Sequence, residues 1–189
     1  MLQLWNYISS IGLDAQADEN LQKRIVLSNR TNLLAAIVFL VTGLLYYSFE
    51  DYRTAYFVES LILFNVLAYY FHYKRQYFWS LSVFLFASYL SIFYFDSYAG
   101  ISAGAALYFI PIVLSLFFLF DLKTKRKLIF AHICVIVVLY LINFFTHNNL
   151  FKSAILTEAM KSNLLIANVI FSLIATAYFL YVLEKQKQT

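Results

Sequence analysis

Six apolar blocks of roughly 20 residues each make up most of this chain, and they restrict its fold more than any other feature. An α-helix rises 1.5 Å per residue, so about 20 residues cross the roughly 30 Å hydrocarbon core of a bilayer. Lipid cannot hydrogen-bond to the backbone, so a spanning segment is a helix or a strand of a closed β-barrel, and barrel strands alternate in polarity. These blocks do not alternate. We therefore predict an all-α polytopic membrane protein with six transmembrane helices, at residues 27–48, 54–72, 77–96, 100–120, 127–146 and 163–184.

Composition supports a membrane protein and argues against several other classes. Charged residues make up 13% of the chain and apolar residues 62%, whereas a soluble domain carries about 25% charged residues. The single cysteine, Cys134, lies inside the fifth block and cannot form an internal disulfide. No basic stripe exists outside the loops, so we expect no nucleic-acid partner.

The distribution of basic residues predicts an orientation. Of the 14 Lys and Arg residues, only Arg53, Lys152 and Lys161 fall on one side when the blocks are threaded alternately across a membrane. Positive charge in short loops is retained on the cytoplasmic side, so we expect both termini in the cytoplasm. The other eleven lie on that side: Lys23, Arg24, Arg30, Lys74, Arg75, Lys123, Lys125, Arg126, Lys127, Lys185 and Lys187.

The segment before the first block predicts an amphipathic N-terminal helix. Apolar residues from Leu2 to Ile11 recur at near-helical spacing, with Trp5 suited to headgroup depth at the cytoplasmic interface. Gly12 would end this helix, and a polar helix over 14–24 would lead into the first span. We expect a leader over 1–24, a six-helix domain over 25–184, and the start of a polar tail or linker over 185–189.

Glu59 is the residue that most suggests a functional site. It lies about five residues inside the second block, so roughly 8 Å below its outer boundary. An ionisable group at that depth is costly and often marks function, such as proton sensing, cation binding or ligand contact. The alternative is a carboxyl satisfied by a neighbouring Tyr, Ser or backbone group. Tyr56, Asp96 and His147 are predicted near the same side and would complete a ligand-binding or proton-sensing site.

No pattern indicates catalysis or a metal. His132 and Asn143 share one face of the fifth block, and polar side chains there hydrogen-bond across helices. No His, Cys or carboxylate pair shows the close spacing typical of a zinc site, and no phosphate-binding loop or nucleophile motif is present. We therefore expect no enzyme activity in this chain, no cofactor and no metal.

Small and polar residues indicate where helices pack. Asn29 and Asn32 in the first block and Asn168 in the sixth lie on faces suited to close approach and interhelical hydrogen bonds. Gly100 and Gly104 form a G-x-x-x-G pattern, which favours either tight packing within the chain or a dimer contact. Pro111 is predicted to kink the fourth span, as a hinge or as a static bend.

The segment that runs straight into the first span resembles the start of a group of bacterial sensor regions. Its sequence is Asn20-Leu21-Gln22-Lys23-Arg24-Ile25-Val26-Leu27-Ser28-Asn29-Arg30. These multi-span regions, common in Bacteroidetes-type genomes, precede histidine kinase or nucleotide cyclase domains. The resemblance covers about residues 15–185. It implies a bacterial inner-membrane location and a last span that continues as a signalling helix. It transfers no ligand-binding residues, and no output domain follows within the 189 residues.

The leading hypothesis is thus a sensory or regulatory membrane domain. Its expected partners are the lipid bilayer, a second copy in a homodimer, and a cytoplasmic kinase or cyclase output domain in cis or in trans. The alternatives are a small transporter or channel, built from two inverted three-helix halves, and a scaffold or assembly subunit.

Overall fold

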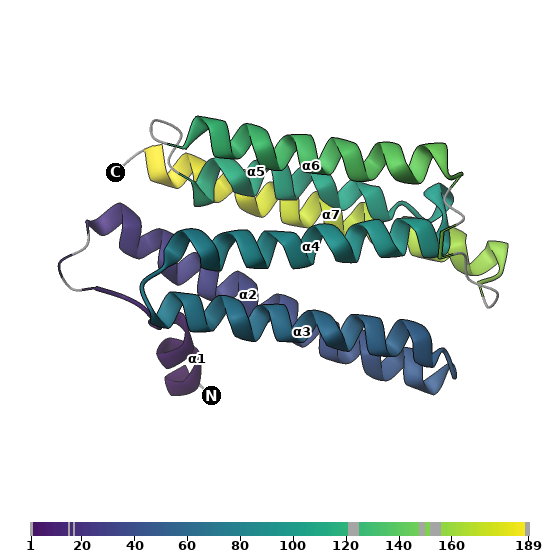
Figure 1. Cartoon of the computed structure of the whole chain (residues 1–189), viewed down its shortest axis with the longest axis horizontal. Helices are drawn as coiled ribbons and strands as arrows, with labels where there is room; N and C mark the ends of the chain where they lie inside the picture. The colour runs from purple at the N-terminus through teal and green to yellow at the C-terminus, as the bar shows by residue number, and fades with distance from the viewer. Residues whose placement is uncertain are drawn as a thin grey trace. The chain divides into compact units, whose positions relative to one another are not determined.

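The structure, a computed structural model, describes residues 2–14, 16, 18–120, 125–147, 150–151 and 156–187. It is 86% helical and contains no strand within these residues, which confirms the prediction of an all-α protein. The chain divides into two compact units, Met1–Ser88 (unit 1) and Tyr89–Thr189 (unit 2), and α4 (Tyr77–Ala99) contributes residues to both (Figure 1).

Five helices are long and apolar enough to cross a membrane. Large apolar side chains such as Leu44, Leu63, Val138 and Ile174 are exposed on their outer faces. A helix that is apolar on all faces is stable when surrounded by lipid and poorly soluble in water. The chain is therefore a membrane-embedded protein, and its five candidate spanning helices are α2 (Glu19–Ser48), α3 (Tyr52–Tyr73), α4, α6 (Arg126–Phe145) and α7 (Glu158–Lys187), the last over Glu158–Tyr181.

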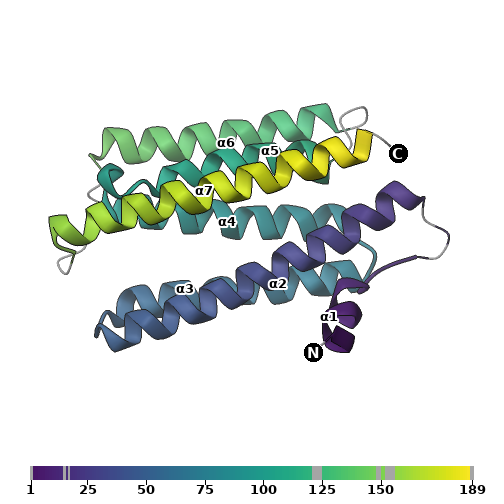
Figure 2. The same ribbon diagram turned by 180° about the vertical axis from the view of Figure 1, so that it is seen from behind.

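Unit 1 is built on the hairpin of α2 and α3, which lie side by side in Figures 1 and 2. Aspartates begin both helices: Asp18 accepts a hydrogen bond from the backbone N–H of Leu21 at 2.8 Å, and Asp51 accepts one from that of Thr54 at 3.2 Å. Such N-caps satisfy backbone donors that have no partner within the helix. Between the helices, Glu50 adopts a left-handed φ of 59° and reverses the chain.

One face of α3 is buried along its whole length. The buried residues recur every three or four positions, which places them on one side of a helix. Several are small or polar, so the two helices approach closely and bond to each other. The buried set is Thr54, Ala55, Val58, Leu61, Asn65, Ala68 and His72.

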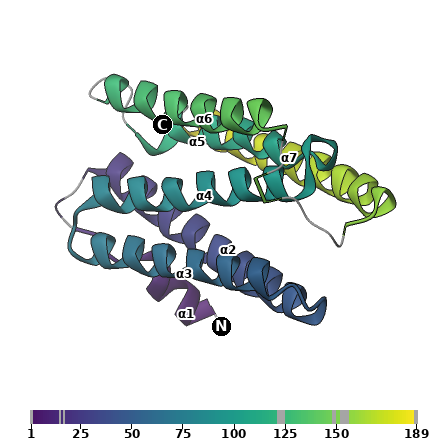
Figure 3. The same cartoon turned by 45° about the vertical axis from the view of Figure 1, so that its right-hand side comes forward.

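Unit 2 contains the second half of α4, two short 3-10 turns and three helices. The 3-10 turns are η1 (Ile101–Ala103) and η2 (Ala105–Tyr108), and α5 (Phe109–Leu119) follows directly. Figure 3 shows α5 between α6 and α7.

The prediction of one kinked helix over 100–120 is wrong. The chain leaves α-helical geometry at Gly100 (φ 85°) and passes Gly104 (φ 74°) before α5 begins. Left-handed backbone cannot continue a right-handed helix. The 11 residues of α5 cover only about 17 Å. Pro111 is the third residue of α5, where its missing N–H removes no intrahelical hydrogen bond, so the break lies upstream of the proline. We call residues 100–108 the interrupted segment.

Candidate functional site

The four residues predicted as a receiving site are divided between the units. Tyr56 and Glu59 lie on α3 in unit 1, whereas Asp96 lies on α4 and His147 follows α6 in unit 2. Each unit thus has its own carboxyl group inside a candidate spanning helix.

In unit 1, Glu59 is half-buried and bonded to a tyrosine of α2. Its Oε2 accepts a hydrogen bond from the Tyr47 hydroxyl at 3.1 Å. The Tyr47 ring meets Tyr56 edge-on, with 5.7 Å between centroids. Gly43 makes room for this carboxyl, because a Cβ there would lie 2.9 Å from Glu59 Cγ. The result is a carboxyl–phenol pair beside an aromatic cluster.

In unit 2, Asp96 is 1% exposed, and its hydrogen-bond partners among the described residues are all neutral. Its Oδ2 accepts a hydrogen bond from Asn143 Nδ2 at 3.1 Å, and the same nitrogen donates to the Phe93 carbonyl at 3.0 Å. The backbone N–H of Ala106, in the interrupted segment, is a further donor to the carboxyl. Within the described part of the chain, Asp96 Oδ1 has no hydrogen-bond partner.

In the described part of the chain, His147 is not among the hydrogen-bond partners of Asp96. It is exposed in the turn after α6, with a left-handed φ of 52°, and its backbone N–H bonds to the Phe144 carbonyl at 3.1 Å. The side chain of α6 that bonds to Asp96 is Asn143, one helical turn earlier.

The shared face of His132 and Asn143 is directed at α4. The Tyr89 hydroxyl lies 3.1 Å from His132 Nδ1, and the Phe120 ring stacks on the imidazole at 5.4 Å between centroids. Tyr89 and Asp96 are seven residues apart, so they lie on one face of α4 two turns apart. Two polar pairs therefore join α4 to α6.

The interrupted segment is hydrogen-bonded to α7 at two points. Asn168 Nδ2 donates to the Ala103 carbonyl at 2.8 Å, and Ser172 Oγ donates to the Leu107 carbonyl at 2.9 Å. The two donors on α7 are four residues apart, and so are the two acceptor carbonyls, so the spacing along α7 equals the spacing along the interrupted segment. We call these two bonds the α7 clasp.

The two glycines of the interrupted segment have different surroundings. A Cβ on Gly104 would lie 2.6 Å from Leu165 Cδ1, so this glycine allows close packing against α7. The space beside Gly100 is open, because the nearest atom to a Cβ placed there would be Ser102 Oγ at 3.9 Å. Within unit 2, Gly104 thus serves packing within the chain.

Asn29 and Asn32 bond to main-chain groups across unit 1. Asn29 Nδ2 donates to the carbonyls of Ser9 at 3.1 Å and Ile11 at 2.8 Å. Asn32 Nδ2 donates to the Asn65 carbonyl at 3.0 Å. The first asparagine holds the segment after α1 (Leu2–Ser9), and the second joins α2 to α3.

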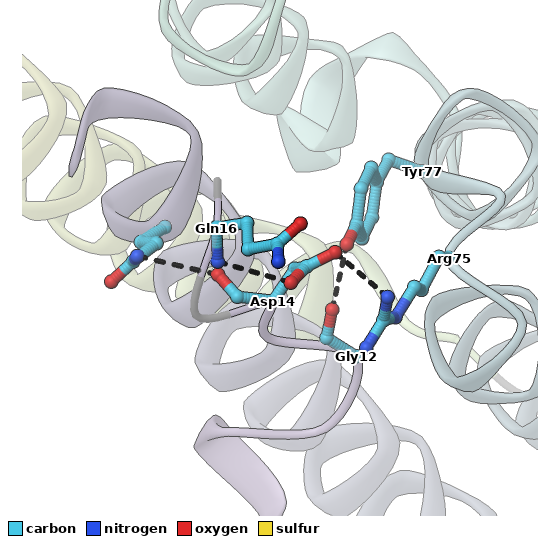
Figure 4. Close-up of polar contacts among 6 residues, drawn as sticks. Gly12, Asp14, Gln16, Arg75 and Tyr77 are labelled. Atoms are coloured by element: carbon cyan, nitrogen blue, oxygen red, sulfur yellow. Dashed lines mark hydrogen bonds and ion pairs between the residues drawn. The ribbon is translucent and has the colours of Figure 1, made fainter. Parts of the chain in front are cut away.

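Residues 9–14, which we call the N-terminal strap, are held at a second point (Figure 4). The Tyr77 hydroxyl donates to the Gly12 carbonyl at 2.7 Å, and Arg75 Nη1 lies 2.7 Å from Asp14 Oδ2. Gly12 has a φ of 79°, and a Cβ there would lie 2.2 Å from the His72 carbonyl oxygen. Only glycine fits this close approach of two main chains.

Sequence reasoning missed Tyr47 as the partner of Glu59 and did not foresee the strap. One signal for Tyr47 was available: it lies four residues after Gly43, on the same face of α2. Asp14 and Arg75 have opposite charges and were both predicted on the cytoplasmic side of the membrane, which was a signal for the strap.

No group of three or more His, Cys, Asp or Glu side chains among the described residues is arranged to hold a metal ion. No protein family, curated protein or solved structure matches this chain.

Proposed function

We propose that this chain is a sensory or regulatory domain of a bacterial inner membrane, with both termini in the cytoplasm and with the interrupted segment and α5 together making a sixth crossing. In this proposal it passes a signal to a cytoplasmic output through α7. The observation that carries the proposal is the α7 clasp, because it attaches the last helix to the segment that directly follows the buried Asp96.

The route from Asp96 to α7 consists of short, named contacts. The Asp96 carbonyl accepts from the backbone N–H of Gly100 at 2.9 Å, and its carboxyl faces the N–H of Ala106. Short 3-10 turns have poorer hydrogen-bond geometry than an α-helix and often mark hinges. A change of charge at Asp96 would therefore move the carbonyls of Ala103 and Leu107, to which α7 is bonded.

The remaining parts of the proposal concern partners. We propose a homodimer in the bilayer, and a kinase or cyclase output domain in cis or in trans that supplies any catalysis. The bias of basic residues supports the orientation, and the resemblance to bacterial sensor regions supports the kind of output.

Distance measurements within unit 2 test this proposal. Spin labels on Lys125→Cys and Glu184→Cys, in a Cys134→Ser background reconstituted in lipid nanodiscs, report the spacing of α6 and α7. Asp96→Asn mimics loss of the charge and is expected to shift the distance distribution. Adding Asn168→Ala and Ser172→Ala should abolish that shift.

Glu59→Gln in the same labelled protein is the matched comparison. A shift with Glu59→Gln and none with Asp96→Asn would place the receiving site in unit 1, with Tyr56 and Tyr47 as its neighbours. Unchanged distances in both variants would contradict the sensor proposal.

A second candidate function, a small transporter or channel, is favoured by one observation. The helical backbone is interrupted beside a buried carboxyl, as in transporters whose discontinuous helices line ion sites. Proteoliposomes with an imposed pH gradient test this candidate. Transport predicts proton or cation flux that Asp96→Asn removes, whereas the sensor proposal predicts flux no greater than in protein-free liposomes.

A further inference from the structure

We propose that Asp96 and Asn143 form a binding site for a small monovalent cation, either a proton or Na⁺. The inference deepens the proposed function, because it names the chemistry of the signal that the receiving site takes. Binding at the site can nevertheless be measured without reference to α7.

The first argument is the missing countercharge. A carboxylate buried in a spanning helix is strongly disfavoured unless a cation compensates its charge. Within the described residues no cationic side chain bonds to Asp96; its partners are the Asn143 amide and the Ala106 backbone. Lys161 of the same unit is paired with Glu158. A bound cation would supply the missing positive charge.

The second argument is a pair of buried oxygens without donors. Asp96 Oδ1 and Asn143 Oδ1 are both buried and, in the part of the chain that the structure describes, neither has a hydrogen-bond partner. A buried acceptor without a partner costs about 1–3 kcal/mol. The two residues are already in contact through Asn143 Nδ2 and Asp96 Oδ2. A proton on Asp96 would convert one acceptor into a donor, and Na⁺ would use carboxylate and amide oxygens as ligands.

Several other groups on the surrounding elements titrate, and none of them is among the partners of the Asp96 carboxyl in the described part of the chain. Tyr89 and His132 bond to each other, and His147 is exposed after α6. None of the described groups carries a positive charge in contact with the Asp96 carboxyl. The other titratable side chains that the structure describes on α4, η2, α6 and α7 are Tyr77, Tyr94, Tyr98, Tyr108, Arg126, Lys127, Cys134, Tyr140, Glu158, Lys161, Tyr178, Tyr181 and Glu184.

Infrared difference spectroscopy of the full chain in liposomes tests the proposal. For a proton, we expect the carbonyl band of a protonated carboxyl at neutral pH, which disappears as the pH is raised and is indifferent to NaCl. For Na⁺, we expect a carboxylate band that shifts with NaCl but not with choline chloride. Asp96→Asn should abolish either signal, and Glu59→Gln, the matched control, should leave it unchanged.

Isotope labelling makes the test independent of whether the variant folds. In wild-type protein with ¹³C-labelled aspartate, the band must move if it belongs to an aspartate. Absence of both an aspartate band and an Na⁺-dependent shift overturns the cation site. A cation-dependent signal with no change in the distance between α6 and α7 keeps the site and contradicts the sensor proposal.

Discussion

The α2–α3 hairpin of unit 1 and the pairing of α7 with the interrupted segment and α5 in unit 2 hold helices together in different ways. In unit 1 two uninterrupted helices share a buried face that runs the length of α3. In unit 2 the partner of α7 is broken by 3-10 turns, and Ser172 is the only buried residue of α7 among the described ones. Continuous packing therefore secures the first pair, whereas the second depends more on the α7 clasp.

The largest effect is expected from Gly12→Ala. The new Cβ would meet main-chain atoms of His72, which cannot move aside, and alanine disfavours the left-handed φ. We expect a loss of about 3 kcal/mol in unfolding free energy, together with release of the strap. Denaturant titration in detergent and limited proteolysis of residues 1–14 measure the two effects.

Gly104→Ala and Gly100→Ala are the counterparts in unit 2. Gly104→Ala meets mainly the ends of the Leu165 and Leu107 side chains, and Gly100→Ala meets open space, so both should cost less than Gly12→Ala. We expect about 1 kcal/mol for Gly100→Ala, from its left-handed φ alone. Equal losses at Gly12 and Gly100 would show that the strap is not closely packed on α3.

An intermediate effect is expected when one asparagine is removed from each unit. Asn32→Ala and Asn168→Ala each remove one hydrogen bond to a carbonyl, and each should lower the unfolding free energy by about 1 kcal/mol. The consequences for dynamics should differ. Hydrogen exchange over residues 101–108 should accelerate in Asn168→Ala, roughly fivefold for 1 kcal/mol, whereas exchange in α2 and α3 should change little in Asn32→Ala.

Ser162→Ala, at an exposed position of α7, controls for the loss of any polar group on that helix. The comparison between the units would be contradicted if hydrogen exchange accelerated more over α2 and α3 in Asn32→Ala than over residues 101–108 in Asn168→Ala.

The smallest effects are expected from the ion pairs. Arg75→Ala removes the pair with Asp14, and Lys161→Ala removes the local pair with Glu158. Exposed pairs contribute about 0–1 kcal/mol, so neither variant should lose more than that. Arg75→Ala should still increase proteolysis of the strap, because its pair joins residues 61 positions apart. Added salt should reproduce this increase in wild-type protein.

Much of the fold follows from the sequence because long apolar blocks leave the backbone few alternatives. The predicted spans at 54–72 and 127–146 differ from α3 and α6 by no more than two residues at either end. The shared face of His132 and Asn143 could also be predicted from the sequence, since helical spacing places both on one side of the helix. The helix starting at Glu19 runs straight into the predicted first span, because Asp18 caps it there.

The interrupted segment could not be predicted from the hydropathy pattern alone. Residues 100–108 are small and apolar, so hydropathy does not distinguish a helix from two 3-10 turns. Gly100 and Gly104 fit a packing motif equally well, and only the structure shows that Gly104 alone lies against α7. The partners of Asp96 and Glu59 also come from other helices, and spacing within one helix does not identify them.

The unbroken course of α7 has a geometric consequence for any protein in which this helix continues. The helix is unbroken between Ser172 and Glu184. The α7 clasp therefore sets the rotational position, about the helix axis, of any residue that follows. Inserting one residue between them would rotate the far end by about 100° around the helix axis, and inserting seven would restore its direction to within about 20°. The helix therefore transmits rotation about its axis as well as displacement along it.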